Sequence, residues 1–423
     1  MRPTVAVPPH TAEETVVPVS TCAGSAPAGA VTTRHQYTSR PPAPAVDAVA
    51  ADLSRALFAP FRRRDQRRKA EMYFQGLLTT SGRKSVRNIA AHLGDPNAEQ
   101  GLHHFISCST WDWRPMRAAL AAYAERAAPA QAWVVRSMHI PKAGEHSVGV
   151  DRLFAPQLGH LFSGQQAIGV WYASERLSVP VHWRLLLTDP WVSDSRRRDR
   201  AEVPAKASAE SLEQCTAEAV LEVVQNNGGA ARRPVVLDVR GGTTATTLTR
   251  LTEAGVPVLA RVTAATRLAV ADRALPGFRA GPLCAQQILE ATKGLRRPVT
   301  WPDPARAGAV RSALASVVRV TVPDAQGRRH PMLLLGEWSD PHQPPSAAWL
   351  TNLGQSPVGR LVRLTRLPRR VDADFAEIGE ACGLRDFMGR SFPGWHRHVT
   401  LASAAHTAMV LARAEHLTTV PRP

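Results

Sequence analysis

Apolar residues recur at helical spacing in the first part of the chain, between about residues 48 and 128. Val49, Leu53 and Leu57 begin this pattern, and further apolar residues repeat it as far as Leu93. Residues three or four positions apart lie on one face of an α-helix, so the pattern predicts amphipathic helices. We therefore expect residues 48–128 to form a small helical domain that binds DNA.

Patterns typical of β-strands replace the helical pattern after residue 129. The predicted elements are, in chain order, strands at 132–136, 166–172 and 181–187, a helix at 208–226, a strand at 234–239, a helix at 244–254 and a strand at 256–262. Three strands followed by alternating helices and strands is the order of an RNase H-like α/β fold, in which helices flank a mixed sheet. We assign residues 129–262 and 366–415 to this core.

The remaining segments are assigned from their composition. The first 45 residues contain eight of the 34 prolines and no apolar periodicity, which is typical of a disordered leader; we assign it to residues 1–47. Residues 263–365 are rich in proline and arginine, and apolar runs at 317–322, 332–337 and 347–351 predict a β-rich insertion lobe. Two final helices are expected near 371–383 and 394–415, followed by a tail at 416–423.

The balance of charged residues favours a polyanionic partner. The chain has 52 Lys and Arg against 35 Asp and Glu, a formal charge of +17. Only five of these basic residues are lysines, an arginine bias that a genome rich in G and C would produce by itself. Such a bias does not remove acidic residues, so the net charge still points to nucleic acid.

The same composition argues against several other classes of protein. No run of about 18 apolar residues is present, and the N-terminus lacks the apolar segment of a secretory signal. We therefore expect a cytoplasmic, nucleoid-associated protein with no membrane partner. The five cysteines are far apart and odd in number, which indicates neither a disulfide framework nor a zinc site.

Three groups of basic residues and one single lysine are candidates for contacts with DNA phosphates. The densest group lies in Phe61–Ala90, a segment that contains nine basic residues and only two acidic ones. For each group, an ordinary solvated surface is the alternative. The candidate residues are Arg62, Arg63, Arg64, Arg67, Arg68, Lys69, Arg83, Lys84, Arg87, Lys142, Arg196, Arg197, Arg198, Arg363, Arg366, Arg369 and Arg370.

Three ordered motifs resemble those of a known family. Residues 141–150, Pro-Lys-Ala-Gly-Glu-His-Ser-Val-Gly-Val, are similar to its Pro-Lys-x-Gly-x-x-Ser-x-Gly-Val stretch. Residues 185–198 are similar to its Leu-Tyr-Leu-Pro-x-x-Trp-x-x-Asp-x-x-Arg segment, and residues 383–398 to its Gly-Leu…Arg-Ser…Gly-Trp-x-Arg-His ending. Over roughly residues 63–413, the chain thus resembles bacterial insertion-sequence transposases of the DDE superfamily endonuclease group.

This resemblance implies a catalytic centre in which three carboxylates hold two Mg²⁺ or Mn²⁺ ions for DNA cleavage. Asp238 occupies the second position, at the end of the fourth core strand. Asp372 occupies the third, on a late helix, where the family has glutamate and where the lysine that follows is replaced by Gly379. At the first position, Arg136 or Ser137 replaces the family's aspartate. An arginine in this place opposes the binding of a cation.

Another acid would have to replace the lost carboxylate if cleavage were retained. Asp151, Asp189 and Asp194 are nearby in sequence, and Asp151, which lies on or near the family's second strand, is the candidate for this role. Glu377 is a poor substitute for Asp372, because five positions along a helix turn a side chain to a different face.

Three hypotheses follow. The first is a transposase-derived DNA-binding protein that has lost DNA cleavage, a domesticated regulator without a cofactor. The second is an active DDE transposase, in which a displaced acid completes a site for Mg²⁺ or Mn²⁺. The third is a transposase scaffold recruited to a role without DNA, as a protein scaffold or a new enzyme. Double-stranded DNA is the expected partner in the first two, and a homodimer would suit two-fold DNA sites.

Overall fold

The computed structural model describes residues 43–419, except residues 96, 156–158, 227–232, 241–243, 304–307 and 325. These residues lie in one compact unit, Arg40–Pro423. Most of the expected leader and the last four residues of the expected tail lie outside the described residues. Helix α1 (Ala43–Phe58) begins inside the segment that the sequence assigns to the leader, because Val46 already packs in the core.

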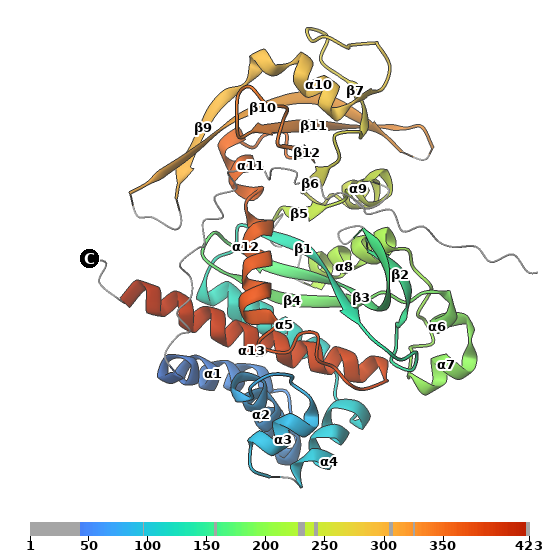
Figure 1. The fold of residues 1–423 in the computed structure, drawn as a ribbon, viewed down its shortest axis with the longest axis vertical. Helices are drawn as coiled ribbons and strands as arrows, with labels where there is room; N and C mark the ends of the chain where they lie inside the picture. Colours follow the sequence, from blue (N-terminus) through green and yellow to red (C-terminus); the bar gives the residue numbers. More distant parts are fainter. Residues whose placement is uncertain are drawn as a thin grey trace, which may run out of the picture. The chain divides into compact units, whose positions relative to one another are not determined.

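The N-terminal helices pack against the long C-terminal helix (Figure 1). They are α1, α2 (Arg64–Thr79), α3 (Val86–His92), α4 (Ala98–His103), the π-helical turn η1 (His104–Cys108) and α5 (Arg114–Ala127), and the C-terminal helix is α13 (Phe392–Thr419). Helices α1, α2 and α5 contact α13 directly. In one such contact, the hydroxyl of Tyr73 donates to Nδ1 of His398 at 2.8 Å. The helical region therefore shares a core with α13.

The central strands form a sheet with RNase H-like order. They are β1 (Ala132–Pro141), β3 (His160–Ala173), β4 (Ser178–Leu185), β5 (Val235–Asp238) and β6 (Val258–Val262). Their order in the sheet is β4-β3-β1-β5-β6. Strand β3 is antiparallel to β1 and β4, whereas β5 is parallel to β1 and β6. This arrangement confirms the predicted α/β fold with an RNase H-like mixed sheet.

Helices cover both faces of this sheet, as neighbouring residues of β4 demonstrate. Arg184 is ion-paired with Glu222 of α8 (Leu212–Asn226), whereas Trp183 donates from Nε1 to Ser403 Oγ of α13 at 2.9 Å. Because successive residues of a strand point to opposite faces, α8 and α13 flank the sheet from opposite sides. Helix α12 (Leu367–Asp374) contacts β1, β3, β4 and β5. Trp171 of β3 packs against both Phe375, just after α12, and α13, so α12 lies on the α13 side.

A buried carboxylate fixes α12 against the sheet. Oδ2 of Asp374 accepts hydrogen bonds from the backbone N–H of Ser178 at 2.9 Å, from the Ser178 hydroxyl at 2.8 Å and from Arg370 Nε at 3.2 Å. Burial raises the pKa of Asp374, while the nearby Arg370 lowers it. A buried carboxylate without such partners would be costly, so this network holds the end of α12 at the start of β4.

The segment between β6 and α12 extends the same sheet. Its elements are β7 (Arg267–Val270), β8 (Leu283–Cys284), α10 (Ala285–Ala291), η2 (Lys293–Leu295), β9 (Arg297–Pro302), β10 (Val310–Pro323), β11 (Arg329–Trp338), β12 (Ala347–Thr351) and α11 (Val358–Leu364). Strand β12 pairs antiparallel with β6, and β11 and β10 follow in order. The insertion is therefore continuous with the core sheet.

The sequence predicted only some of the strands of the insertion. The expected strands at 317–322, 332–337 and 347–351 fall within or coincide with β10, β11 and β12. Strands β7, β8 and β9 were not predicted, and neither was β2 (Asp151–Ala155), which pairs with β3. These strands have two to six residues. Strand β12 is equally short, but its run Ala-Ala-Trp-Leu is continuously apolar, whereas a short strand without such a run cannot be distinguished from a loop by its pattern.

The described helices and cysteines add two observations. Among the described helices, none has both the length and the apolar character that crossing a membrane would require. The four described cysteines are free thiols. Cys215 and Cys382 are buried, whereas Cys108 is exposed.

Two tryptophans form the centre of the core between the sheet and the C-terminal helices. Trp171 and Trp183 are at most 1% exposed, and their ring centroids lie 6.1 Å apart. A Cβ atom at Gly169 would lie 2.7 Å from the Trp183 ring and 2.9 Å from Nε1 of Trp171. Only a glycine leaves room for both rings at this position of β3.

Acidification should destabilise the protein through two buried histidines of α13. Burial lowers the pKa of His398 to about 4 and that of His406 to about 3, whereas an unfolded histidine titrates near pH 6.5. Below about pH 6.5 the unfolded state therefore binds more protons, so stability is complete above this pH and falls as the pH decreases toward 4. The midpoint of urea unfolding, followed by circular dichroism, should decrease across this range.

The variant His406→Leu tests the assignment of this pH dependence. It removes one group that gains a proton on unfolding, so its free energy of unfolding should fall less steeply, by about 1.4 kcal/mol per pH unit. An identical pH slope in the variant and the parent protein would contradict the assignment.

Candidate functional site

The three positions that the resemblance assigns to metal ligands meet at the carboxyl end of β5. Asp238 is the last residue of β5, and the parallel strand β1 places Val134 opposite Val236. Continuing this register by two residues brings Arg136 level with Asp238 on the neighbouring strand, with both side chains on the same face. Asp372 of α12 reaches the same face, where its Oδ1 accepts a hydrogen bond from Arg136 Nε at 2.9 Å.

Arg136, at the position that the resemblance assigns to the first carboxylate, is ion-paired with Asp372, at the position that it assigns to the third. Its side chain is 20% exposed, and Nη1 also donates to the backbone O of Ser137 at 3.1 Å. The guanidinium carbon lies 3.6 Å from the ring centroid of Phe375, a cation–π contact. Burial lowers the pKa of Arg136, and the Asp372 carboxylate opposes this effect. The guanidinium is thus held by a carboxylate, a carbonyl and an aromatic ring.

The carboxylate of Asp238 is likewise ion-paired with an arginine, Arg240. Nε of Arg240 lies 2.9 and 3.0 Å from the two carboxylate oxygens, and Nη2 lies 2.6 Å from Oδ2. The backbone N–H of Arg240 adds a hydrogen bond at 3.1 Å. This pairing raises the pKa of Arg240. Sequence reasoning did not single out Arg240, although it follows the strand-end acid by only two residues.

These residues do not fit a pair of divalent cations. Two ions need several oxygen ligands and carboxylate charge to neutralise them. The centre offers two carboxylates, and a guanidinium is paired with each. The residue at the first ligand position, Arg136, is itself a cation, which repels a metal ion through the partly buried surroundings. No metal-dependent step can be derived from this arrangement.

The acids considered as replacements lie elsewhere. Asp151 pairs with Gly164 of β3, and Arg136 pairs with Gly169 of the same strand. These two partners are five positions apart, which corresponds to about 16 Å along a strand. The Asp151 carboxylate instead accepts from the hydroxyl of Thr188 at 2.6 Å. Glu377 is ion-paired with Arg413 of α13 at 2.6 Å. Neither carboxylate completes the centre.

One predicted basic group, the arginine stripe formed by Arg360, Arg363, Arg366, Arg369 and Arg370, is only partly exposed. Arg366 is paired at 2.5 Å with Glu337, which is buried. Arg370 is held by Asp374 and by the backbone O of Arg176, at 2.6 Å. Both guanidinium groups are therefore already paired within the fold, and their contact with DNA stays a prediction. The stripe residues that remain exposed are Arg360, Arg363 and Arg369.

Most of the predicted basic residues of the N-terminal helices lie on the surface. Lys84 is the exception: it is 4% exposed, and its ammonium group donates to the backbone O of Thr80. Its burial and this hydrogen bond argue against the predicted contact with DNA and favour a structural role. Lys69 is half-buried. The exposed members of the group are Arg62, Arg63, Arg64, Arg67, Arg68, Arg83 and Arg87.

Lys142 is also held inside the fold. Its Nζ donates to the backbone O of Phe387 at 2.5 Å. Burial, with a smaller contribution from the charge of Arg83, lowers the pKa of Lys142 to about 8. Lys142 follows the far end of β1, six positions from Arg136, so it does not lie beside the acidic centre.

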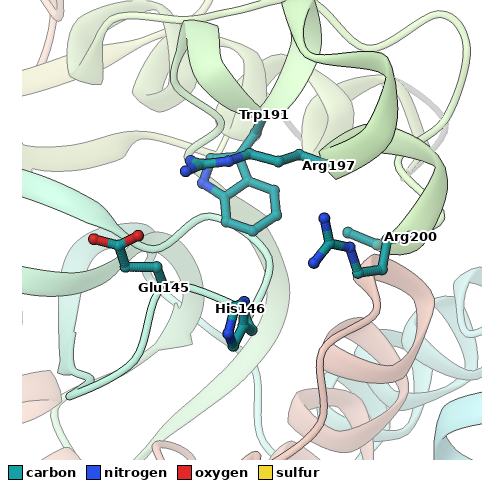
Figure 2. Close-up of a pocket in the computed structure, with 6 residues that line it drawn as sticks. Glu145, His146, Trp191, Arg197 and Arg200 are labelled. Carbon is teal, nitrogen blue, oxygen red and sulfur yellow. The ribbon is translucent and has the colours of Figure 1, made fainter.

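The third basic group borders a pocket that joins two of the family-like motifs. Figure 2 shows Glu145 and His146, from the loop after β1, across from Trp191, Arg197 and Arg200. The last three come from α6 (Asp189–Ser193) and α7 (Ser195–Arg200). The pocket has a volume of about 120 Å³. Arg196 is exposed, and Arg198 is half-buried and donates to the backbone O of Ala205. His146 and Arg200 were not among the predicted residues.

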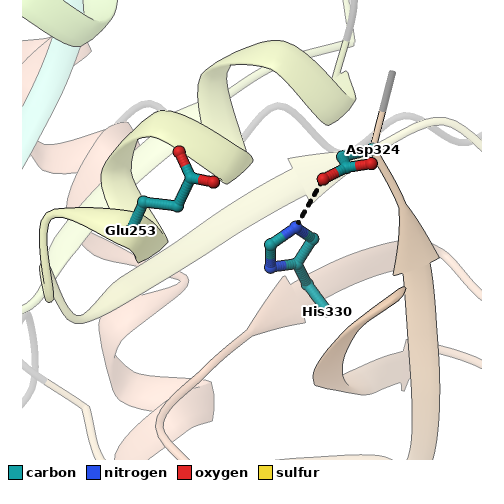
Figure 3. A group of neighbouring side chains, drawn as sticks. All are labelled: Glu253, Asp324 and His330. Atoms are coloured by element: carbon teal, nitrogen blue, oxygen red, sulfur yellow. Dashed lines mark hydrogen bonds and ion pairs between the residues drawn. The ribbon is translucent and has the colours of Figure 1, made fainter. Parts of the chain in front are cut away.

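A second cluster with metal-ligand side chains was not predicted from the sequence. Figure 3 shows Glu253 of α9 (Thr244–Glu253) near Asp324 and His330, whose Nε2 lies 3.1 Å from Asp324 Oδ2. Arg328, however, lies 2.6 Å from Asp324 and 2.7 Å from Glu253. Its guanidinium already neutralises both carboxylates, so the cluster closes the β10–β11 hairpin rather than offering a free cation site.

The strand order and the strand-end acid define the class of this protein, an RNase H-like α/β protein related to DNA transposases. A family model described as DDE superfamily endonuclease matches residues 56–326, more than half of the chain. The chain belongs to this family, whose members typically use divalent metal ions. No curated protein matches the chain. The matched range ends before α12, so the place of Asp372 in the centre rests on its contact with Arg136.

Proposed function

We propose that this transposase-like protein binds double-stranded DNA and does not cleave it, and that it acts as a DNA-binding regulator derived from a transposase. The observation that carries the proposal is the position of Arg136. It replaces the first metal ligand and neutralises the third. Cleavage by this fold depends on the positive charge of two metal ions, and the centre holds guanidinium groups where those ions would bind.

Binding of DNA is supported by the exposed arginines. The N-terminal helices present seven of them, and α7 and the stripe add more. Each cation that neutralises a phosphate releases counterions from the DNA, which supplies affinity without reading its sequence. The retained scaffold and this charge together favour DNA over a role without nucleic acid.

One experiment tests both halves of the proposal. The purified protein is incubated with supercoiled DNA in Mg²⁺ or Mn²⁺, and its affinity for linear duplex DNA is measured between 50 and 200 mM salt. We expect no metal-dependent nicking. A protein with about 6–10 phosphate contacts should lose roughly 10³–10⁵ in affinity over this salt range. Nicking that Asp238→Ala abolishes would refute the loss of cleavage, and an affinity independent of salt would refute DNA binding.

Variants with a matched control test whether arginines of α7 contact the DNA phosphates. Replacing both Arg197 and Arg200 by glutamine should weaken binding and reduce the salt slope by about 1.8, because each phosphate contact contributes about 0.9. Arg55→Gln is the control, since Arg55 is exposed but already neutralised by Asp52 at 3.1 Å. An equal effect of both changes would argue against contacts at α7.

A further inference from the structure

One arginine beside the remnant centre has no anionic partner. Arg261 of β6 lies opposite Asp238 of β5 and opposite Trp349 of β12. Its side chain is half-buried, and its guanidinium carbon lies 5.9 Å from the centroid of the Trp349 ring. Within the described part of the chain, no hydrogen bond or ion pair reaches this guanidinium. Arg136, Arg240 and Arg366, in contrast, are each paired with a carboxylate.

The acids nearest to Arg261 are already neutralised. Asp238 is bound by Arg240, and Glu337 by Arg366. Burial lowers the pKa of Arg261, and the positive charges of Arg240 and Arg369 act in the same direction, while the carboxylates of Asp238 and Glu337 oppose them from a distance. A half-buried cation among other cations is unfavourable unless an anion accompanies it.

A second unpartnered group lies next to this cation. Trp349 is 4% exposed, and its indole Nε1 has no hydrogen-bond acceptor in the described structure. Buried donors of this kind are nearly always paired. This donor lies beside Arg261, but Trp349 does not line the pocket that Arg261 borders, so Arg261 is the group that an anionic ligand would satisfy.

A pocket of suitable size opens at this place. It has a volume of about 330 Å³, at the lower end of ordinary ligand pockets. Arg240 and Arg261 line it together with the polar side chains of Thr263, Gln286 and Ser346. Among the described residues that line the pocket, none is acidic. Its walls come from β6, from the start of α10 and from the segment just before β12. Because α10 and β12 belong to the insertion, the pocket forms only where the insertion extends the core sheet.

We propose that this pocket binds a phosphate group of a nucleic acid or a nucleotide, with Arg261 as its principal cation. Guanidinium groups pair with phosphate through two parallel hydrogen bonds, which makes arginine the preferred residue for this purpose. The volume leaves room for the sugar attached to the phosphate. If the source of the phosphate is DNA, the inference rests on the proposed function and names one of its contacts.

The test compares Arg261→Gln with the parent protein. The probes are inorganic phosphate, deoxyadenosine monophosphate, and one duplex with and without a 5′-phosphate, each measured by calorimetry and by thermal unfolding. The parent should bind at least one probe, with a dissociation constant about tenfold to a hundredfold lower than that of Arg261→Gln. Arg261→Lys should recover part of the loss. Arg267→Gln, which removes an exposed arginine of β7, should bind as the parent does.

The probes distinguish the sources of the phosphate. If Arg261→Gln loses affinity only for the duplex with a 5′-phosphate, the pocket binds a DNA end. If it loses affinity equally for both duplexes, the pocket binds an internal phosphate. If it loses affinity for the nucleotide alone, the pocket binds a small ligand. Because Arg261 makes no hydrogen bond in the fold, Arg261→Gln should unfold at no lower temperature than the parent in the absence of ligand. Equal affinity of the parent and Arg261→Gln for every probe would overturn the inference, even if DNA binding through the N-terminal helices persists. Binding of phosphate without binding of DNA would overturn the proposed function alone.

Discussion

Replacing Arg136 by aspartate should turn the remnant centre into a site that binds a divalent cation. The change removes a guanidinium, frees the Asp372 carboxylate that it neutralises and places a third carboxylate on β1 level with Asp238. In the presence of Mn²⁺ at 100 times its dissociation constant, the free energy of unfolding should rise by about 2.7 kcal/mol. Mn²⁺ titration by calorimetry and by thermal unfolding measures both quantities, and the parent protein should show no response.

Two further variants sharpen this expectation. Arg136→Asn has the same length as the aspartate variant but no charge, so it should bind Mn²⁺ at most weakly. Adding Arg240→Gln to Arg136→Asp frees Asp238 as well and should tighten Mn²⁺ binding further. A parent protein that is stabilised by Mn²⁺ as strongly as Arg136→Asp would show that the arginine does not exclude the metal.

The largest loss of stability is expected for Trp171→Ala. The ring is fully buried and packs against Trp183, Phe375 and His406. Removing a buried aromatic side chain leaves a cavity and typically costs about 3–5 kcal/mol. The midpoint of urea unfolding, followed by circular dichroism, should decrease accordingly. Because Phe375 also contacts Arg136, the same variant should loosen the support of the centre.

Trp171→Phe is the matched control. Nε1 of Trp171 has no hydrogen-bond partner in the described structure, so phenylalanine removes volume without breaking a hydrogen bond. We expect it to cost less than half as much as alanine. A cost below about 1 kcal/mol for Trp171→Ala would contradict the central place of this ring in the core.

The order of the core elements could be predicted from the sequence because its strands are long or strongly apolar. The runs around Trp133, Trp171 and Trp183 become β1, β3 and β4, and the short run ending at Asp238 becomes β5. The final helices were also expected, although a π-helical turn, Phe375–Gly379, replaces regular helix just after Asp374. Asp372 and Phe375 still contact the same guanidinium.

Only individual residues of the candidate site could be predicted from the sequence, not the contacts between them. The resemblance pointed to Arg136 as a replacement for the first carboxylate, but the ion pair of Arg136 with Asp372 joins residues 236 positions apart and depends on how α12 packs on the sheet. The burial of Lys84 and the pairing of Arg366 and Arg370 were invisible for the same reason. Arg261 gave one signal, a charge inside the apolar run Val258–Val262.

The pairing of β12 with β6 also covers what would otherwise be a free edge of the core sheet. An RNase H-like sheet that ended at β6 would present a row of free backbone N–H and C=O groups, to which a strand of another chain could add. Here Leu259–Val262 pair with Ala348–Thr351 of the same chain, and Thr351 Oγ1 donates to the backbone O of Val258 at 2.6 Å. The insertion thus protects this edge of the core from intermolecular strand addition and aggregation.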